Sequence, residues 1–461
     1  MKIRKTILFY LFLASLFTGC TEQSTSRICQ ENHLVVNNSR PVSTVKSPDN
    51  ADNEIVNVSE PNGVLTLRQV LALTLMHNPE LKAFSLETRA AEARELQAGL
   101  RPNPELGVEI ENVGGTGPQR SFDAAESTLQ LSQLIELGDK AGKRQKVAAF
   151  EKELASLDFQ SKKLDIFSET AKAFILVLKA QEELQLSNEL LKLSEESFAA
   201  VEKRVSAGKD SPIEKTRASV VFSNIKIAYF ETQRNLDYAK KHLASFWGQD
   251  TPLFEQAAGS LDSITPLPSS EDMKNQLKQN PQYTRWETEI QKSRAVLDLE
   301  KSKAIGDITV GAGVRRFNET HDNAFVLGVS IPLPLSDRNQ GAKQEAVYNL
   351  AKSSQEQKAA WLKLHNEFNQ AYQDYANSYH RAASLKNDVL PSANEMFDAA
   401  TRAYQEGKVD YLNVLDAQRT FFEVKSEYIQ SLAAYHTAKM NIERLIGNHA
   451  ETATISESIE E

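Results

Sequence analysis

The sequence predicts a mainly α-helical protein with a small set of membrane β-strands and an internal duplication. The duplication is visible directly, because residues 198–222 realign with residues 397–421 at a constant shift of 199 positions. Apolar residues also recur at every seventh position over long stretches such as 361–403, which is typical of packed helices. Four short segments alternate between apolar and polar side chains, which is typical of strands. Together these observations indicate an assembly built by repetition of one unit.

The N-terminus predicts export from the cytoplasm. Basic residues precede an apolar run at 7–17 that is too short to span a membrane. The run is followed by Thr-Gly-Cys, which resembles the cleavage site of a bacterial lipoprotein. We therefore expect a lipoprotein signal peptide at 1–19, a lipidated first residue at Cys20 and a flexible tether at 20–62. The alternative is an ordinary signal peptide in which Cys20 is incidental.

Two strand hairpins are predicted, one at 104–135 and one at 306–335. Their apolar faces consist of Leu106, Val108, Ile110, Leu129, Leu131, Ile308, Val310, Ala312, Val314, Phe325, Leu327, Val329, Ile331 and Leu333. Small or charged residues on the opposite face suit a wall with lipid on one side and water on the other. The alternative is a pair of ordinary amphipathic hairpins packed on a soluble core.

The strands also predict oligomerisation. No apolar run after residue 20 is long enough for a transmembrane helix, so the chain would cross a membrane as strands. Four strands cannot close a barrel, since the smallest useful barrels have about eight, and open strand edges are not tolerated in lipid. Several chains must therefore contribute to one pore.

The long helices are predicted to pack as coiled coils. One unbroken seven-residue row contains Trp361, Phe368, Tyr375, Ala382, Val389, Met396 and Ala403, and a second contains Val414, Phe421, Tyr428, Tyr435 and Ile442. A continuous helix from 340 to 405 would be near 100 Å long. Pro391 should remove one backbone hydrogen bond and bend this helix. The helical hairpins should turn at Gly208 and Gly407, because glycine accepts the positive φ of a helix C-terminus.

These elements divide the chain into two repeats. The first is predicted at 63–250 and the second at 271–448, with a linker at 251–270 and a polar tail at 449–461. Each repeat contains a strand hairpin followed by a helical hairpin, at 140–247 in the first copy and 339–447 in the second.

At this level of detail the sequence resembles the TolC-like outer-membrane efflux proteins. The run AYQEGKVDYLNVLDAQRTFFE resembles their tip and return helix, and the segment from TLRQVLALTLMHNPELKAF to RPNPEL resembles their first equatorial segment and entry strand. The resemblance covers residues 64 to 447. LRPNPELGVEIEN and LSQLIELGDKAGKR look most like the heavy-metal (cobalt-zinc-cadmium) branch, although that branch usually has paired glycines before Lys-Arg.

The resemblance implies a homotrimer in the outer membrane. Three chains would each give four strands to a shared 12-stranded barrel and four long helices to a periplasmic α-helical barrel. The chain would be a passive, lipid-anchored conduit that works with a periplasmic adaptor (membrane fusion) protein and an RND-type inner-membrane pump. Its substrate would be heavy-metal cations, with multidrug or other small-molecule efflux as the alternative.

The resemblance also assigns roles to residues near the hairpin turns. The aperture and gating positions are Glu214, Tyr404, Asn413 and Asp416, and the adaptor-docking tips are Ala207, Gly208, Glu406 and Gly407. In a trimer, rings of Glu214 and Asp416 would favour cations, whereas Asn413 stands where the family has an aspartate. The alternatives are solvated helix faces for the two acids and core packing for Tyr404.

Other functions find no support in the sequence. The eight histidines lack metal-ligand spacing, so no dedicated metal site and no cofactor are expected. No phosphate-binding loop or nucleophile elbow is present, which argues against an enzyme. The net charge of −9 is not that of a nucleic-acid-binding protein. A periplasmic adaptor or a structural coiled-coil envelope lipoprotein would leave the paired strand hairpins unexplained.

Overall fold

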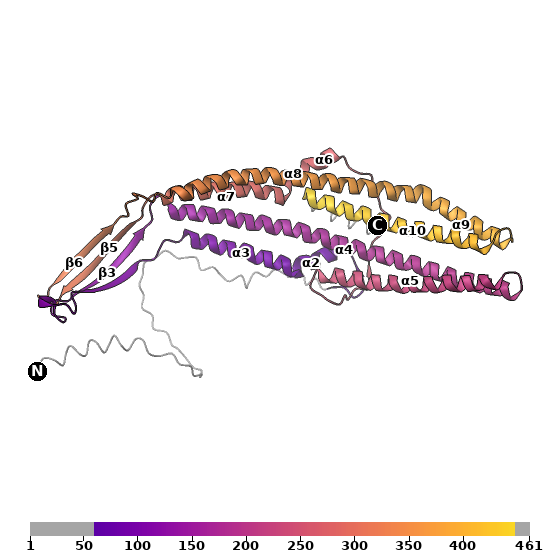
Figure 1. Cartoon of the computed structure of the whole chain (residues 1–461), viewed down its shortest axis with the longest axis horizontal. Coiled ribbons are helices and arrows are strands. Elements are labelled where there is room, and N and C mark those ends of the chain that lie inside the picture. The colour runs from indigo at the N-terminus through magenta and orange to yellow at the C-terminus, as the bar shows by residue number, and fades with distance from the viewer. Residues whose placement is uncertain (1–59, 448–461) are drawn as a thin grey trace, which may run out of the picture. The chain divides into compact units, whose positions relative to one another are not determined.

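The computed structural model describes residues 60–447, except the side chain of Pro118 (Figure 1). The helices are α2 (Leu67–His77), α3 (Pro79–Gly99), α4 (Lys140–Ser206), α5 (Pro212–Ser245), α6 (Ser270–Gln276), α7 (Pro281–Lys303), α8 (Gln340–Ser384), α9 (Leu390–Gln405) and α10 (Tyr411–Ile446), with 3-10 turns at Gly117–Gln119 and Leu277–Gln279. The strands are β1 (Val64–Leu65), β2 (Glu105–Glu111), β3 (Glu126–Ile135), β4 (Gln256–Ala257), β5 (Ile308–Phe317) and β6 (Asn323–Ser330). The predicted signal peptide, Cys20, most of the tether and the C-terminal tail lie outside the described residues.

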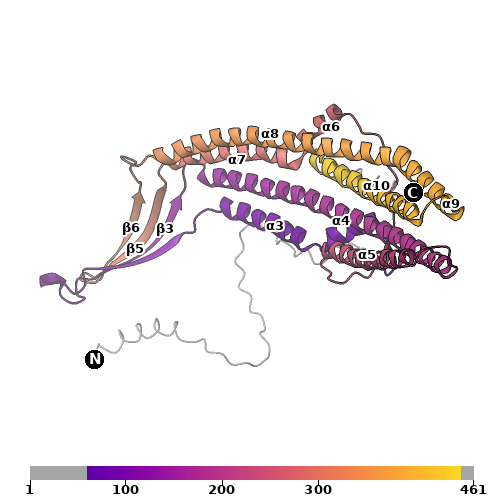
Figure 2. The ribbon, with the colours of Figure 1, turned by 45° about the vertical axis from the view of Figure 1, so that its right-hand side comes forward.

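The helix α4 packs on α3, α5, α7 and α10, whereas α8 packs on α7 and α10 (Figure 2). The 67 residues of α4 correspond to a length of about 100 Å. Ion pairs mark its neighbours: Lys152 contacts Glu95 of α3 at 2.7 Å, and Asp158 contacts Arg285 of α7 at 2.6 Å. Further along, Asp165 lies 3.1 Å from Arg444 of α10. The N-terminal part of α4 therefore packs on α3 and α7, and the remainder, from about Asp165 onward, packs on α5 and α10 (Figure 1).

The two strand hairpins join in one antiparallel sheet of order β2-β3-β5-β6. The join is between β3 and β5, with Leu131 opposite Ala312, so β2 and β6 form the two edges. The predicted apolar face is exposed in this chain, and Phe325 and Leu327 retain 89% and 84% of their accessible surface. A sheet with a bare apolar face needs a lipid or protein partner.

The strand β6 is shorter than predicted. It ends at Ser330, and the next five residues, 331–335, have no regular structure. The side chain of Leu333, which the alternation placed on the apolar face, is 75% exposed. Pro332 and Pro334 have no backbone N–H, so neither residue can donate to a strand ladder. The period-two pattern alone did not reveal this end.

The long helix of the second repeat contains a π-helical turn. Residues Leu385–Val389 are π-helical, and the N–H of Leu390 donates to the carbonyl of Leu385. This turn precedes Pro391 and inserts one residue into the seven-residue row. Val389 and Met396 of this row are 41% and 42% exposed within this chain, whereas Ala393 is buried, so after the π-helical turn the row no longer lies on the buried side of the helix.

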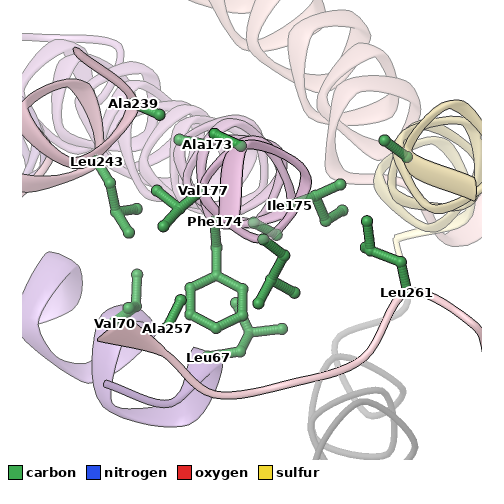
Figure 3. Packing of buried hydrophobic residues seen from close by; sticks show 14 of the residues in the cluster. Leu67, Val70, Ala173, Phe174, Ile175, Val177, Ala239, Leu243, Ala257 and Leu261 are labelled. Carbon is green, nitrogen blue, oxygen red and sulfur yellow. The ribbon is translucent and has the colours of Figure 1, made fainter. Parts of the chain in front are cut away.

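The main core lies between α4, the linker and the helices around them. Phe174 of α4 is completely buried, and its ring points toward Leu67, Val70 and Ala257 (Figure 3). Burial of one such side chain contributes about 1.5–3 kcal/mol. These contacts fix α2 and β4 on the middle of α4, next to Leu243 of α5.

The seven-residue row of α10 also holds the linker through hydroxyl groups. Tyr428 donates to Asp262 at 2.8 Å, and the Tyr435 hydroxyl donates to the carbonyl of Thr265 at 3.0 Å. Burial raises the pKa of Tyr428, so its hydroxyl stays a donor. The adjacent His436 ring nitrogen Nε2 lies 2.9 Å from the carbonyl of Leu261. Positions predicted only as apolar packing thus also anchor the linker.

A buried carboxylate fastens the start of the described chain. Glu60 is 8% exposed and accepts hydrogen bonds from Trp247 Nε1 at 3.0 Å and from the backbone N–H groups of Leu253 and Phe254 at 2.6 and 3.0 Å. Three donors satisfy a buried carboxylate. Among residues 60–447, no helix combines the length and hydropathy that crossing a bilayer requires.

Candidate functional site at the hairpin tips

The two helical hairpins turn through the same backbone geometry. In the first turn, Gly208 has φ +69° and Lys209 N–H donates to the carbonyl of Arg204 at 2.9 Å. In the second, Gly407 has φ +72° and Lys408 N–H donates to the carbonyl of Ala403 at 2.9 Å. These are Schellman ends, which need a residue that tolerates positive φ. The predicted tip residues Ala207, Gly208, Glu406 and Gly407 all lie in these turns, and all four are exposed.

Three side chains connect one tip to the other. Arg204 donates from Nε and Nη2 to the two carboxylate oxygens of Asp210, at 2.8 and 3.0 Å. The Tyr404 hydroxyl of the second hairpin donates to the same carboxylate at 3.0 Å. The Arg204 guanidinium also lies 4.8 Å from the centre of the Tyr404 ring, which is a cation–π contact. We call Arg204, Asp210 and Tyr404 the tip latch.

The latch shifts the protonation of its members. The hydrogen bond from Arg204 holds the pKa of Asp210 below its ordinary value. Burial, followed by the hydrogen bond to Asp210, raises the pKa of Tyr404 to about 12. At neutral pH, Asp210 is therefore an anion and Tyr404 a neutral donor, which are the forms that the contact requires.

The predicted acidic residues both have arginine partners. Arg217 Nη1 lies 2.7 and 2.8 Å from the two carboxylate oxygens of Glu214, one helical turn away. Asp416, which is 68% exposed, lies 3.2 Å from Arg419. Asn413 is exposed, and its amide lies 3.5 Å from the carbonyl of Asp410. The arginines offset part of the negative charge that the sequence pattern predicted.

One predicted residue, Asp416, lies in a groove that both repeats line. A cavity of about 760 Å³ lies between α4, α5 and α10, and its walls include Arg217 of the first repeat and Asp416 and Arg419 of the second. The apolar part of the lining comes from residues such as Leu190 and Phe422. Glu214 and Tyr404 are not part of this lining. The structure thus places Asp416 in the groove and Tyr404 in the latch, and Glu214 contacts the groove only through Arg217. Asn413 contacts the carbonyl of Asp410 instead.

Sequence reasoning missed Arg204 and Asp210. Their signal is two opposite charges on either side of the Gly208 turn, where the turn brings them together. The duplication concealed them, because the corresponding second-copy positions are Ala403 and Val409. Within residues 60–447, no three histidine, cysteine, aspartate or glutamate side chains gather as metal ligands.

Comparison with known proteins identifies the class. The model of the outer membrane efflux protein family matches residues 70–249 and again residues 273–448. The chain belongs to this family, a non-enzymatic class of outer-membrane channels, and its mainly helical fold is that of the TolC-like channels.

Particular relatives follow. The chain is 33% identical to the cobalt-zinc-cadmium resistance protein CzcC of Cupriavidus metallidurans, over 84% of this chain and 91% of that protein. It is 26% identical to the nickel and cobalt resistance protein CnrC of the same organism, over 62% and 66% of the two chains. The crystal structure of the outer membrane protein VceC from Vibrio cholerae is similar with a TM-score of 0.68 at 18% identity, covering 83% of this chain and 96% of that one. This last likeness shows the fold alone.

Proposed function

We propose that this protein is the outer-membrane channel of a tripartite heavy-metal efflux system, through which metal cations pass without an energy-coupling step. The observation that carries the proposal is the 33% identity to a cobalt-zinc-cadmium resistance protein over nearly the whole of both chains. The geometry agrees with it, since a sheet with an exposed apolar face continues directly into long helical hairpins.

The functional unit is a homotrimer. Both edges of the sheet, β2 and β6, are unpaired in the described chain, and unpaired edges cannot face lipid. Pairing of β6 in one copy with β2 in the next satisfies both edges, and three copies close the sheet. Cys20 provides a lipid anchor in the outer membrane, and the helices extend into the periplasm.

The hairpin tips dock a periplasmic adaptor, which connects the channel to an RND-type inner-membrane pump. Gly208 and Gly407 lie in exposed turns with no atom near the position of an added Cβ. An adaptor can therefore approach the backbone of both turns closely. The two repeats at 63–250 and 271–448 each contribute one tip.

The tip latch holds the periplasmic entrance closed. Arg204 and Asp210 belong to the first hairpin and Tyr404 to the second, so breaking the latch frees the hairpins to move apart. Glu214, Asn413 and Asp416 lie close to this entrance. Because Arg217 and Arg419 offset the two acids, the entrance attracts cations less strongly than a fully acidic ring would.

Growth of a deletion strain tests this proposal. The strain is exposed to zinc, cobalt, cadmium, copper, silver and several antibiotics, with and without the intact gene. We expect sensitivity to metals that the gene restores. Sensitivity to antibiotics alone would leave the channel function standing and would overturn the assignment of metals as the substrate.

A glycine pair tests the docking role. Gly407→Lys places a bulky charge at the tip and should abolish metal resistance without lowering the yield of cross-linked trimer. Gly117→Lys is the matched control, because Gly117 also has positive φ, +67°, with open space around it, but lies in the loop between β2 and β3. Normal resistance in the Gly407 variant would remove the tip from the docking surface.

A further inference from the structure

Two adjacent arginines on β5 point to opposite faces of the sheet. Arg316 follows Val314 on the apolar face, is exposed, and lies opposite Ser127 of β3. Arg315 lies on the polar face, opposite Thr128. Neighbouring side chains of a strand alternate in this way, so one residue faces water and the next faces the bilayer surface of the proposed channel.

Arg315 makes contacts across three strands. Its Nη1 lies 2.9 Å from Glu126 on β3, its Nη2 lies 3.0 Å from Glu111 on β2, and its Nε donates to the Thr128 hydroxyl at 2.9 Å. All three guanidinium nitrogens therefore have partners. Asn112 donates to the other oxygen of Glu126 at 3.1 Å. The arrangement fixes the guanidinium above the sheet, near the ends of the strands that carry the loops.

The charges on this face are unequal. Among the strand residues, four glutamates, Glu105, Glu109, Glu111 and Glu126, share the polar face with the single base Arg315. Three negative charges thus remain uncompensated in each chain. Removing the charge of Arg315 would leave four uncompensated negative charges in each chain. Because Arg315 lies beside Glu111 and Glu126, the added charge would appear at the end of the sheet that carries the loops.

We propose that Arg315 is a specificity-determining residue of the outer mouth of the pore, where it limits the preference for cations by neutralising one of four glutamates per chain. Rings of fixed charge in a pore select ions of the opposite sign. Arg315 thereby keeps the mouth from retaining the cations that the channel must release. This inference rests on the proposed channel function.

Reversal potentials in planar bilayers under a potassium chloride gradient test the inference. Arg315→Gln should raise the ratio of potassium to chloride permeability on the order of twofold or more. Arg316→Gln, which removes the same charge from the neighbouring residue on the other face, should leave the ratio unchanged. An unchanged ratio for Arg315→Gln, or an equal rise for Arg316→Gln, would overturn the proposal.

A double variant separates charge from structure. Arg315→Gln with Glu126→Gln also breaks the ion pair but leaves three uncompensated glutamates per chain, as in the wild type. Its permeability ratio should return to the wild-type value, and a ratio that stays raised would show that lost strand contacts, not charge, cause the change. If Arg315→Gln forms no channels, Glu126→Gln provides the comparison: it leaves two uncompensated glutamates per chain, so its ratio should fall below that of the wild type, and an unchanged ratio would overturn the proposal. Failure of the wild-type protein itself to form channels would overturn the proposed function instead.

Discussion

The two repeats share their helix caps and their stacked aromatic pairs, but they differ in the side chains at their tips. Asn78 caps α3 and donates through its amide to the carbonyl of Phe246 at 2.8 Å, and Asn280 caps α7 and donates to the carbonyl of Leu445 at 2.8 Å. Near the tips, Phe198 stacks on Phe222, and Phe397 stacks on Phe421, both with an interplanar angle of 9°. The phenylalanine pairs are related by a shift of 199 in numbering, whereas Asn78 and Asn280 are related by a shift of 202.

The tips show the opposite behaviour. The positions of Arg204 and Asp210 in the first repeat are occupied by Ala403 and Val409 in the second, which cannot form the ion pair. The position of Tyr404 is occupied by Val205 in the first repeat, which has no hydroxyl group. A latch between two hairpins needs different groups on its two sides, because a donor must meet an acceptor. The comparison teaches that duplication retained what the backbone requires, whereas the contact between the copies required them to diverge.

The largest expected effect is at the paired asparagines. Asn280→Ala and Asn78→Ala should each lower the free energy of unfolding by about 2–4 kcal/mol, because each loses a helix cap and a buried hydrogen bond. Thermal unfolding of the purified protein in detergent measures this loss. Asn→Ser at either position retains a capping oxygen but not the amide, so it should lie between Ala and wild type. A large loss in one copy only would break the equivalence of the repeats.

The tip glycines should give a smaller effect. Gly208→Ala and Gly407→Ala put a Cβ on a left-handed residue and should each cost about 1–2 kcal/mol of local stability. Hydrogen exchange at the two turns measures this cost. Gly341→Ala lies inside α8 with open space around it, so it should be neutral or stabilising. Equal exchange in the Ala variants and the wild type would show that the turns do not depend on positive φ.

Removal of the Tyr404 hydroxyl from the latch should have a smaller effect than the glycine substitutions. Tyr404→Phe removes one hydrogen bond, worth about 1 kcal/mol or about fivefold in the ratio of closed to open channels. Single-channel recordings should show a higher open probability. Tyr229→Phe is the control, since that hydroxyl accepts a hydrogen bond from Gln233 on the same helix. An open probability that rises equally in both variants would contradict a specific role of the latch.

The pH dependence of opening refines the latch further. The lowered pKa of Asp210 means that its carboxylate stabilises the closed tip at pH values above the ordinary pKa of aspartate. This contribution is lost as the pH falls through the pKa of Asp210 itself. The raised pKa of Tyr404 means that its protonated hydroxyl stabilises the closed tip at pH values below the ordinary pKa of tyrosine. This contribution is lost as the pH rises through about 12.

Open probability should therefore increase below about pH 4 and above about pH 10. Bilayer recordings at a series of pH values measure both limbs. Asp210→Asn should flatten the acid limb, and Tyr404→Phe should flatten the alkaline limb. Unchanged acid opening in Asp210→Asn would assign that limb to other carboxylates.

The features of the fold that the sequence predicted correctly are those that depend on adjacent residues. The Gly208 and Gly407 turns and the alternating strands each depend on a few adjacent residues, so they could be predicted without knowing which elements pack beside them. The end of β6 and the exposure of Val389 and Met396 were not predicted. The first depends on missing N–H groups at Pro332 and Pro334, and the second on one inserted residue in the π-helical turn. Of the three latch residues the sequence singled out Tyr404 alone, and Asp210 and Arg204 were overlooked.

The sequence by itself determined the duplicated pattern and the tip turns, because periodicity and turn chemistry are properties of short segments. The efflux family was indicated by the resemblance of particular segments to that family. Only the tertiary structure showed that Glu214 and Asp416 are paired with arginines, that Tyr428 and Tyr435 hold the linker, and that Arg315 crosses three strands. The tyrosine and Arg315 contacts join residues that are distant in the chain, so spacing along the sequence does not reveal them. The two acid–arginine pairs are three residues apart on one helix, so spacing permits them, but only the structure shows that the side chains adopt the rotamers that meet.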